Sequence, residues 1–160
     1  LGMGLRHSAK LIKLPYLYTD LYQRFKFPPE HSGVALEEPA ICLVCGQILC
    51  AGNRGTDSRI TSDPGECTLH ARTCGAGTGV FFLVQMCKCL LIRGSRSCYY
   101  PSLYVDRDGE VEDSRRHNRP LFLFTKRYRK LQAMYLKHQI VVEVVRRRTS
   151  EDRLIRENWY

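Results

Sequence analysis

Two short Cys/His pairs are the residues whose types and spacing indicate chemistry. Cys42 and Cys45 form the first pair, and Cys67 and His70 form the second, each with two residues between its members. Zinc prefers thiolate and imidazole donors, and a two-residue gap lets one tight turn aim both donors at the same ion. Gly46 follows the first pair, at a position where such a turn can require a positive φ. The pairs predict one tetrahedral zinc site; the alternative is free core cysteines or disulfides.

A fifth candidate leaves the ligand set open. Cys74 follows His70 by four residues, the spacing that closes a zinc finger, so it is a reserve ligand that could replace Cys67 or His70. We favour Cys67 with His70 because this pair repeats the spacing of the first pair. Cys50 is expected to lie in the core, as free cysteines often do. Four protein ligands leave no coordination position for water, so the sequence predicts a structural site and not a catalytic one.

Several segments around these pairs carry a family resemblance. They are Cys-Leu-Val-Cys-Gly at 42–46, the run at 67–83, Tyr-Pro-Ser-Leu-Tyr-Val-Asp-Arg-Asp-Gly-Glu at 100–110, Arg-Pro-Leu-Phe-Leu at 119–123 and Arg-Tyr-Arg-Lys-Leu at 127–131. In this order they resemble the C-terminal region of UBR-family E3 ubiquitin ligases, the N-recognins of the N-degron pathway. The chain departs from the family pattern at Glu112, where Asp is expected, and at His117-Asn118, where an Arg-Gly pair is expected.

The resemblance implies a zinc-binding C-terminal cap of a RING-type ligase that recognises destabilising N-terminal residues. Such ligases place degron recognition in a UBR box and E2 recruitment in a RING, which needs eight ligands for two zinc ions. This chain offers one four-ligand set, so it is expected to be non-catalytic by itself. The implied partners are the other domains of the parent ligase and, through them, E2 enzymes and N-degron substrates. The implied role is regulatory or autoinhibitory, in the cytoplasm or the nucleus.

Length, composition and cysteine content limit the classes of protein to which the chain can belong. A chain of 160 residues with 44% hydrophobic and 26% charged residues fits one globular domain. It holds no run of about 20 apolar residues, so no membrane span is expected. Eight cysteines without a secretory signal indicate a reducing compartment and metal binding. Because the first residue is not Met, we expect a segment of a longer protein.

The net charge of +9 raises nucleic acid as a partner, but no nucleic-acid-binding signature accompanies the charge. The densest basic cluster is Arg146, Arg147 and Arg148, which is typical of a solvated face or a contact with an acidic protein surface. Nucleic acid is therefore not an expected partner. The alternative function from another class is a free-standing zinc module that binds RNA or acidic peptides through its basic surface.

A second charged segment has the opposite sign. Asp106, Asp108 and Glu110 form an acidic loop around Gly109. The glycine falls at the fourth place and not the sixth, so this loop does not fit a calcium-binding hand. Hydrogen bonds to the loop's own backbone, or to Arg115 and Arg116, are the expected use of these carboxylates. With the cluster at 146–148, the loop predicts two surfaces of opposite charge that fix domain orientation.

The expected fold class is α+β: a small antiparallel sheet with helices, stapled by one structural zinc site. Residues 1–39 form a helical lead-in and loop, and 40–160 form the zinc-binding domain, as one compact unit. The sheet is expected from 80–93 and 120–124, covered by a helix over 125–145. The expected elements are a helix near 16–26, a loop at 28–39, strands at 48–50, 80–86, 88–93 and 120–124, loops at 51–66 and 94–118, and a helix over 125–138 followed by a helix or strand at 139–145.

Overall fold

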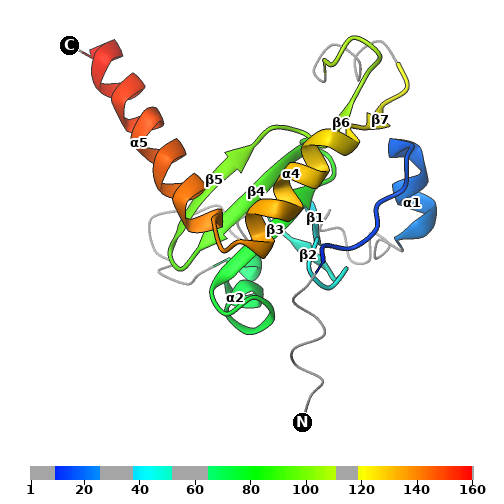
Figure 1. Cartoon of the computed structure of the whole chain (residues 1–160), viewed down its shortest axis with the longest axis horizontal. Coiled ribbons are helices and arrows are strands. Elements are labelled where there is room, and N and C mark those ends of the chain that lie inside the picture. Colours follow the sequence, from blue (N-terminus) through cyan, green and yellow to red (C-terminus); the bar gives the residue numbers. More distant parts are fainter. Residues whose placement is uncertain (1–9, 26–37, 52–64, 111–118, 160) are drawn as a thin grey trace, which may run out of the picture.

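The structure is a computed structural model that describes residues 10–25, 38–51, 65–110 and 119–159, with side chains described up to 150. Its main feature is a five-stranded antiparallel sheet with the strand order β2-β1-β3-β4-β5 (Figure 1). The strands are β1 Pro39–Cys42, β2 Ile48–Cys50, β3 Thr78–Leu83, β4 Lys88–Arg93 and β5 Arg96–Tyr100. A second sheet of two strands pairs β6 Tyr104–Val105 with β7 Phe122–Leu123.

Helices lie on both faces of the main sheet. They are the short 3₁₀ helix η1 Tyr18–Asp20, α1 Leu21–Arg24, α2 Glu66–Cys74, α4 Thr125–Leu136 and α5 Ile140–Trp159. Figure 1 shows α4 and the first half of α5 crossing one face, whereas the second half of α5 extends away from the sheet. Within the part of the chain that the structure describes, no helix combines the length and the apolar character that crossing a membrane requires.

The central strand β3 is apolar on both faces. Side chains alternate along a strand, so Val80 and Phe82 point to one face while Phe81 and Leu83 point to the other. All four are buried, and the two pairs belong to two separate hydrophobic clusters. An uninterrupted apolar run that follows a glycine-rich turn is typical of a strand that is covered on both sides. The sequence at 78–84 therefore requires a layer of structure above the sheet and another below it.

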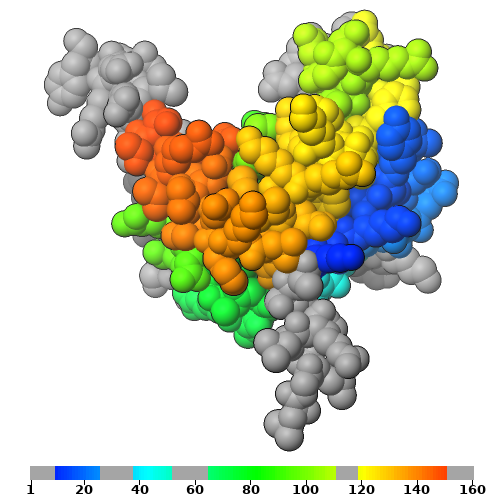
Figure 2. All heavy atoms as spheres, in the orientation of Figure 1, coloured from blue at the N-terminus to red at the C-terminus, as the bar shows by residue number. Residues whose placement is uncertain are grey.

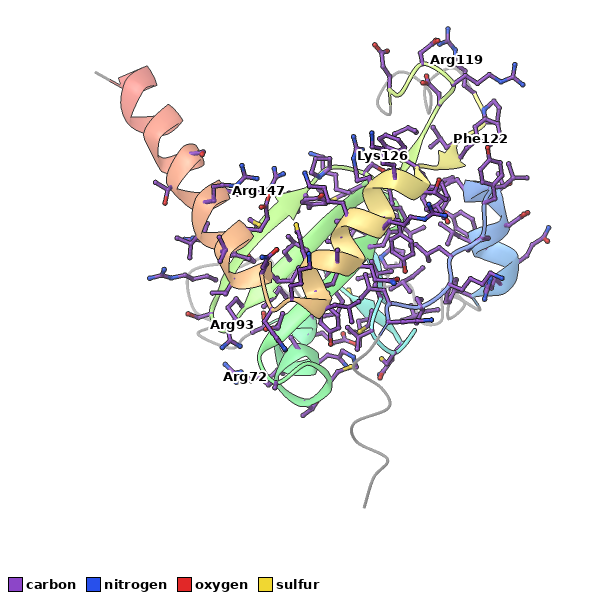
Figure 3. The ribbon with its side chains drawn as sticks, viewed as in Figure 1. Arg72, Arg93, Arg119, Phe122, Lys126 and Arg147 are labelled. Carbon is purple, nitrogen blue, oxygen red and sulfur yellow. The ribbon has the colours of Figure 1, made fainter. Side chains whose placement is uncertain are left out.

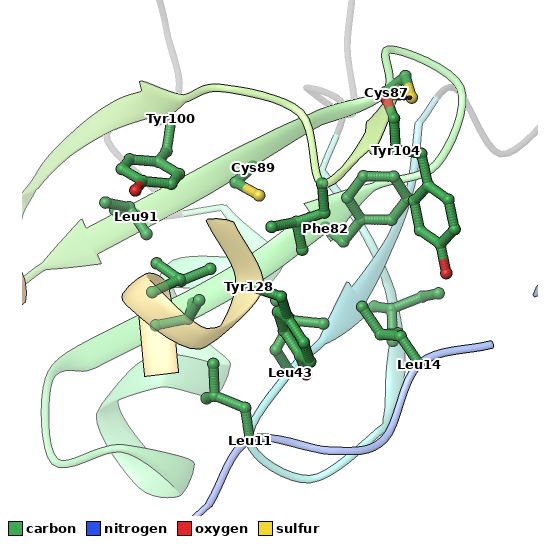
Figure 4. Close-up of a cluster of buried hydrophobic side chains, with 14 of the residues drawn as sticks. Leu11, Leu14, Leu43, Phe82, Cys87, Cys89, Leu91, Tyr100, Tyr104 and Tyr128 are labelled. Carbon is green, nitrogen blue, oxygen red and sulfur yellow. Dashed lines mark hydrogen bonds between the residues drawn. The ribbon is translucent and has the colours of Figure 1, made fainter. Parts of the chain in front are cut away.

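The larger cluster lies between the sheet and α4. Tyr128 and Leu131 of α4 are buried in this cluster with Phe82, Leu43 and Leu91 (Figure 4). Figure 2 shows α4 and the first half of α5 forming a continuous surface over this side of the molecule. Their apolar residues recur at intervals of three and four, which places them on one helix face.

The smaller cluster lies between the other face of the sheet and α2. Gly79 explains how closely this helix approaches, because a Cβ there would lie 2.5 Å from Cε2 of Phe81 and 2.9 Å from Cβ of Ala71. Real Cβ atoms do not approach other carbon atoms so closely. The glycine run at 75–79 therefore allows tight packing of the α2–β3 connection, as the sequence predicted.

Tyrosine hydroxyl groups hold the N-terminal segment on the domain. Tyr128 donates a hydrogen bond to the carbonyl oxygen of Ile12, and Tyr104 donates to that of Pro15 at 2.6 Å. Leu11, Leu14 and Leu21 are buried in the larger cluster. The described residues 10–25 thus complete the core on the side of α4.

The α+β class and the antiparallel sheet are confirmed, but three element predictions are wrong. Residues 96–100 form β5 and not a loop, because their exposed and buried side chains alternate along β4. Residues 122–123 pair with 104–105 in the second sheet and do not join the main one. Residues 66–74 form a helix where a tight turn and loop were expected.

The remaining element predictions are confirmed with shifted ends. The hairpin of β3 and β4, the strand β2 and the helix α4 lie where the sequence places them, and 140–159 is a helix and not a strand. The expected helix near 16–26 is limited to η1 and α1. Glu112, His117-Asn118, and most of the loops at 28–39 and 51–66 lie outside the described residues.

We expect Leu131→Ala to lower the free energy of unfolding by about 2–5 kcal/mol, because it leaves a cavity beneath α4. The side chain of Leu131 is fully buried. Leu136→Ala in the same helix is the matched control, since this leucine is 43% exposed, and it should cost well under half as much. Urea unfolding followed by circular dichroism measures both values. Equal losses for the two variants would show that α4 does not pack on the sheet as described.

Candidate metal centre

The β1–β2 hairpin positions the first two candidate ligands. Cys42 is the last residue of β1, and Cys45 lies in the turn that leads to β2. The amide of Gly46 donates to the carbonyl oxygen of Cys42 at 2.7 Å, and the amide of Cys42 donates to that of Gln47 at 2.9 Å. Gly46 has a φ of +84°, a conformation that residues with a Cβ rarely adopt. The tight turn that the sequence predicted is therefore present.

Helix α2 positions His70 and Cys74. Residues four apart lie one turn apart on the same face of a helix, so both side chains point the same way. The helix ends just after Cys74, where the amides of Gly75 and Gly77 donate to the carbonyl oxygen of Ala71 at 3.0 and 2.9 Å. This tight ending turns the chain directly into β3, next to β1. The C-terminal end of α2 thereby faces the turn of the β1–β2 hairpin.

The donor atoms of Cys42, Cys45, His70 and Cys74 all lie within 4.8 Å of one another. The sulfur atoms of Cys42 and Cys74 are 4.0 Å apart, and the sulfur of Cys45 is 3.3 Å from Nε2 of His70. In a tetrahedral zinc site, bonds of about 2.3 Å to sulfur and 2.05 Å to nitrogen give edges of about 3.8 Å between sulfurs and 3.5 Å between sulfur and nitrogen. The four side chains therefore fit one tetrahedral ion, and the cysteines are not joined in disulfides.

The electrostatics of the thiols also fit a cation. Burial raises the pKa of Cys42 to about 12, although backbone amides of Cys45 and Val44 act in the opposite direction. Burial and the neighbouring Cys45 raise the pKa of Cys74. The buried thiol of Cys42 therefore does not ionise at neutral pH without a positive partner, and a divalent ion is such a partner. The same amides then donate to the Cys42 thiolate.

Cys67 lies outside this group, so the structure favours the reserve ligand Cys74 in its place. Cys67, His70 and Cys74 occupy positions i, i+3 and i+7, which share one helix face, and spacing alone cannot choose among them. Cys67 lies about 10 Å from Cys74 along the axis at 1.5 Å per residue. It is buried in the smaller cluster, and burial raises its pKa to about 12. Cys50 is buried in the core, as predicted.

The acidic loop is organised around Asp106. Its carboxylate accepts hydrogen bonds from the amides of Asp108 at 2.8 Å and Glu110 at 2.9 Å, and its side chain is 3% exposed. Arg119 lies 3.8 Å from Asp106 and 3.9 Å from Asp108. Asp106 thus shapes its own loop, as expected, whereas Arg115 and Arg116 lie outside the described residues. Asp108 remains a surface residue, with 77% of its side chain exposed.

The basic cluster is partly used inside the domain. Arg146 and Arg147 donate to the same carboxylate oxygen of Glu143 at 2.7 and 2.6 Å. Burial acts to raise the pKa of Glu143, but the hydrogen bonds and the positive charges of the two arginines together lower the pKa below the usual value. Arg147 also stacks 4.9 Å over the ring of Tyr100 in β5. The spacing of Glu143 from Arg146 and Arg147 is a local helical pattern, whereas the stacking of Arg147 on Tyr100 joins residues far apart in the chain and has no local signal.

The sequence of this chain is similar to the sequences of known proteins. A family model described as Proteolysis_6 C-terminal matches residues 3–137. The chain is 33% identical over 158 residues to the human E3 ubiquitin-protein ligase UBR2, and 33% identical over 158 residues to the human E3 ubiquitin-protein ligase UBR1. It is 35% identical over 132 residues to the zebrafish (Danio rerio) E3 ubiquitin-protein ligase ubr3.

These matches cover most of this chain and little of the relatives. They include 96% of the chain for the two human proteins and 82% for the zebrafish protein. The chain spans only about a tenth of the relatives' length, at 9%, 9% and 7% respectively. The resemblance that the sequence motifs indicated is therefore confirmed.

We expect Cys74→Ser to abolish binding of one metal ion, while Cys67→Ser retains it. Both residues lie in α2 and the substitution is identical, so the pair separates ligation from helix packing. Elemental analysis of the purified variants and the visible spectrum of the Co²⁺-substituted protein give the metal content and the number of thiolate ligands. If Cys67→Ser loses the ion and Cys74→Ser shows a normal spectrum, the ligands are Cys42, Cys45, Cys67 and His70, as the repeated spacing predicted.

Proposed function

The chain belongs to the Proteolysis_6 C-terminal family, and on that basis we propose that it is a zinc-binding C-terminal cap of a UBR-type E3 ubiquitin ligase. The ligase would recognise N-degrons, and the cap would pack on the ligase's other domains without transferring ubiquitin itself. The observation that carries this proposal is the four-residue donor set placed between the β1–β2 hairpin and α2.

Zn²⁺ is the ion that this donor set suits best. Three thiolates and one imidazole are soft and borderline donors, which disfavour Mg²⁺ and Ca²⁺. The four residues would supply a complete tetrahedron from the protein alone. Such an ion has no open position for substrate or water, so it would join two elements of the fold and take no part in a reaction.

The proposal of a non-catalytic cap rests on the number of zinc-ligand sets in the chain and on its similarity to a short part of much longer ligases. A RING needs two zinc sites in a cross-braced order, whereas this sequence offers one paired set of ligands. Cys50, Cys67, Cys87, Cys89 and Cys98 are buried in the two hydrophobic clusters or at their edges, which accounts for the remaining cysteines. We infer that E2 recruitment and degron recognition belong to other domains, and that this cap restrains access to them, in the cytoplasm or the nucleus.

The isolated chain should form no ubiquitin chains when it is mixed with E1, a panel of E2 enzymes and ubiquitin, because it supplies no second zinc site to hold an E2. Gel electrophoresis with antibodies to ubiquitin measures the products. The full ligase provides the positive control, and the same ligase with Cys45→Ser tests whether loss of the ion disturbs only the cap. E2-dependent chains that disappear on changing Cys42 would contradict the non-catalytic assignment.

Reversing the exposed charges of α5 should loosen docking of the cap on the rest of the ligase. Arg146→Glu with Arg148→Glu is the variant, and Arg147 is left in place because it stacks on Tyr100 within the domain. Since Arg146 also donates to Glu143 and Arg148 to the carbonyl oxygen of Ser97, an unchanged melting temperature of the isolated chain must accompany the result. Lys126→Glu with Arg129→Glu on α4 changes the net charge equally and is the control. Limited proteolysis of the full ligase and its affinity for an N-degron peptide are the measurements. Equal behaviour of both variants and the wild type would mean that the cluster at 146–148 is only solvated.

A further inference from the structure

A hollow of about 700 Å³ lies beside the metal centre, between the turn that follows α2 and the junction of α4 and α5. One wall consists of residues from Thr73 to Thr78 with Arg93 of β4, and the other consists of residues from Tyr135 to Val141. Cys74 belongs to both the hollow and the metal site. The hollow thus lies where three elements meet and where the proposed ion would hold one wall rigid.

The second wall of the hollow leads into an exposed apolar surface. Leu136 and Val141 line the hollow and are 43% and 39% exposed. Val142, the next residue, and Val145, one turn further along α5, are 62% and 44% exposed. Valine is a poor helix former because its branched side chain loses rotamer freedom, so propensity does not explain these valines. Contiguous exposed apolar side chains beside a hollow are typical of a binding surface.

The charged side chains in the segments around the hollow are basic. The segments 67–83, 93–100 and 125–142, which build its walls, contain no Asp or Glu but hold the exposed cations Arg72, Arg93 and Lys137. Figure 3 shows Arg72 and Arg93 at the same end of the molecule, close to the start of α5. The next acid, Glu143, already accepts from Arg146 and Arg147. The proposed site, with three thiolates and one neutral imidazole on a divalent ion, would carry a net charge of −1, which the three cations outweigh.

Arg93 is held in position by the turn that it faces. Its Nη1 atom donates to the carbonyl oxygen of Ala76 and to the hydroxyl of Thr78, both at 3.2 Å. The Nε and Nη2 groups of the same guanidinium have the fork geometry that a carboxylate accepts with two parallel hydrogen bonds. An arginine already fixed on one side loses less conformational entropy when it binds.

Two unusual backbone positions line the same hollow. Among the described residues that are not glycine, positive φ angles occur at Ala76 (53°), Cys87 (52°) and His138 (56°), and the first and last of these line the hollow. His138 ends α4 in a Schellman motif, since its amide donates to the carbonyl oxygen of Tyr135 and that of Gln139 donates to Met134. Glycine is the usual residue at this position. The side chain of His138 is exposed and lines the hollow, so its imidazole is within reach of a ligand bound there.

We propose that this hollow docks a protein segment in which carboxylates flank an apolar side chain, supplied by another part of the parent ligase. The apolar side chain would contact Leu136 and Val141, and the carboxylates would accept from Arg93 and His138. This inference rests on the proposed function, because it names the surface by which the cap binds the rest of its ligase.

The test places a photoreactive benzoylphenylalanine at Leu136 in the full ligase and identifies the crosslinked segment by mass spectrometry. Tyr16 is the second position, because it is 62% exposed and packs on Phe122, which Figure 3 shows far from Arg93. We expect Leu136 to capture a segment with at least two carboxylates beside an apolar residue. Arg93→Glu should lower the yield about tenfold or more, since it opposes a carboxylate with a like charge.

His138→Gly separates binding from folding. Glycine suits the positive φ at this position, so the melting temperature should stay the same or rise, whereas the crosslink at Leu136 should fall several-fold. A crosslink that is unchanged by both variants would overturn the proposal, as would capture of RNA or of a segment without carboxylates. If Tyr16 captures another domain and Leu136 captures nothing, the proposal that the hollow docks a segment is wrong, whereas the proposed cap role stands. If neither position captures any part of the ligase, the cap role fails as well.

Discussion

The structure depends on a strand that must be buried on both faces. β3 has a large apolar side chain at each of Val80, Phe81, Phe82 and Leu83, and none of them is compatible with a solvent-exposed face. One layer comes from α4 and α5, whose apolar stripes are long enough to cover the sheet. The other layer comes from α2, a helix of nine residues. The sheet is therefore covered on both faces, by two longer helices on one face and by one short helix on the other.

The unequal layers explain why the metal centre lies where it does. A helix of nine residues is marginal by itself, and the β1–β2 hairpin is also short. An ion bound by Cys42, Cys45, His70 and Cys74 would join these two weak elements directly. The larger cluster beneath α4 has enough buried apolar surface to need no such link. The donor set is thus found on the side of the sheet where hydrophobic packing supplies least.

At the junction between the two layers, several residues have a backbone conformation or a solvent exposure that is unusual for their type. Ala76 and His138 adopt positive φ angles, and valines face solvent at the start of α5. Both strained residues line the hollow that adjoins Cys74. Departures of this kind are costly, and they persist where the surrounding structure or a binding partner makes use of them. The candidate metal ligand Cys74 therefore adjoins a hollow whose walls carry both of these residues.

The sequence by itself determined the features that depend on local pattern. The apolar run at 80–84, the helical spacing at 125–136 and the turn residue Gly46 predicted β3, α4 and the turn of the candidate metal site. Local spacing could not choose between Cys67 and Cys74, because both share a helix face with His70. Only the tertiary structure decided, since the hairpin approaches the C-terminal end of α2. The stacking of Arg147 on Tyr100 and the hollow likewise depend on contacts between residues far apart in the chain, which no local pattern records. The strand β5, by contrast, follows β4 through the two-residue turn Gly94-Ser95, a local signal that the sequence analysis missed.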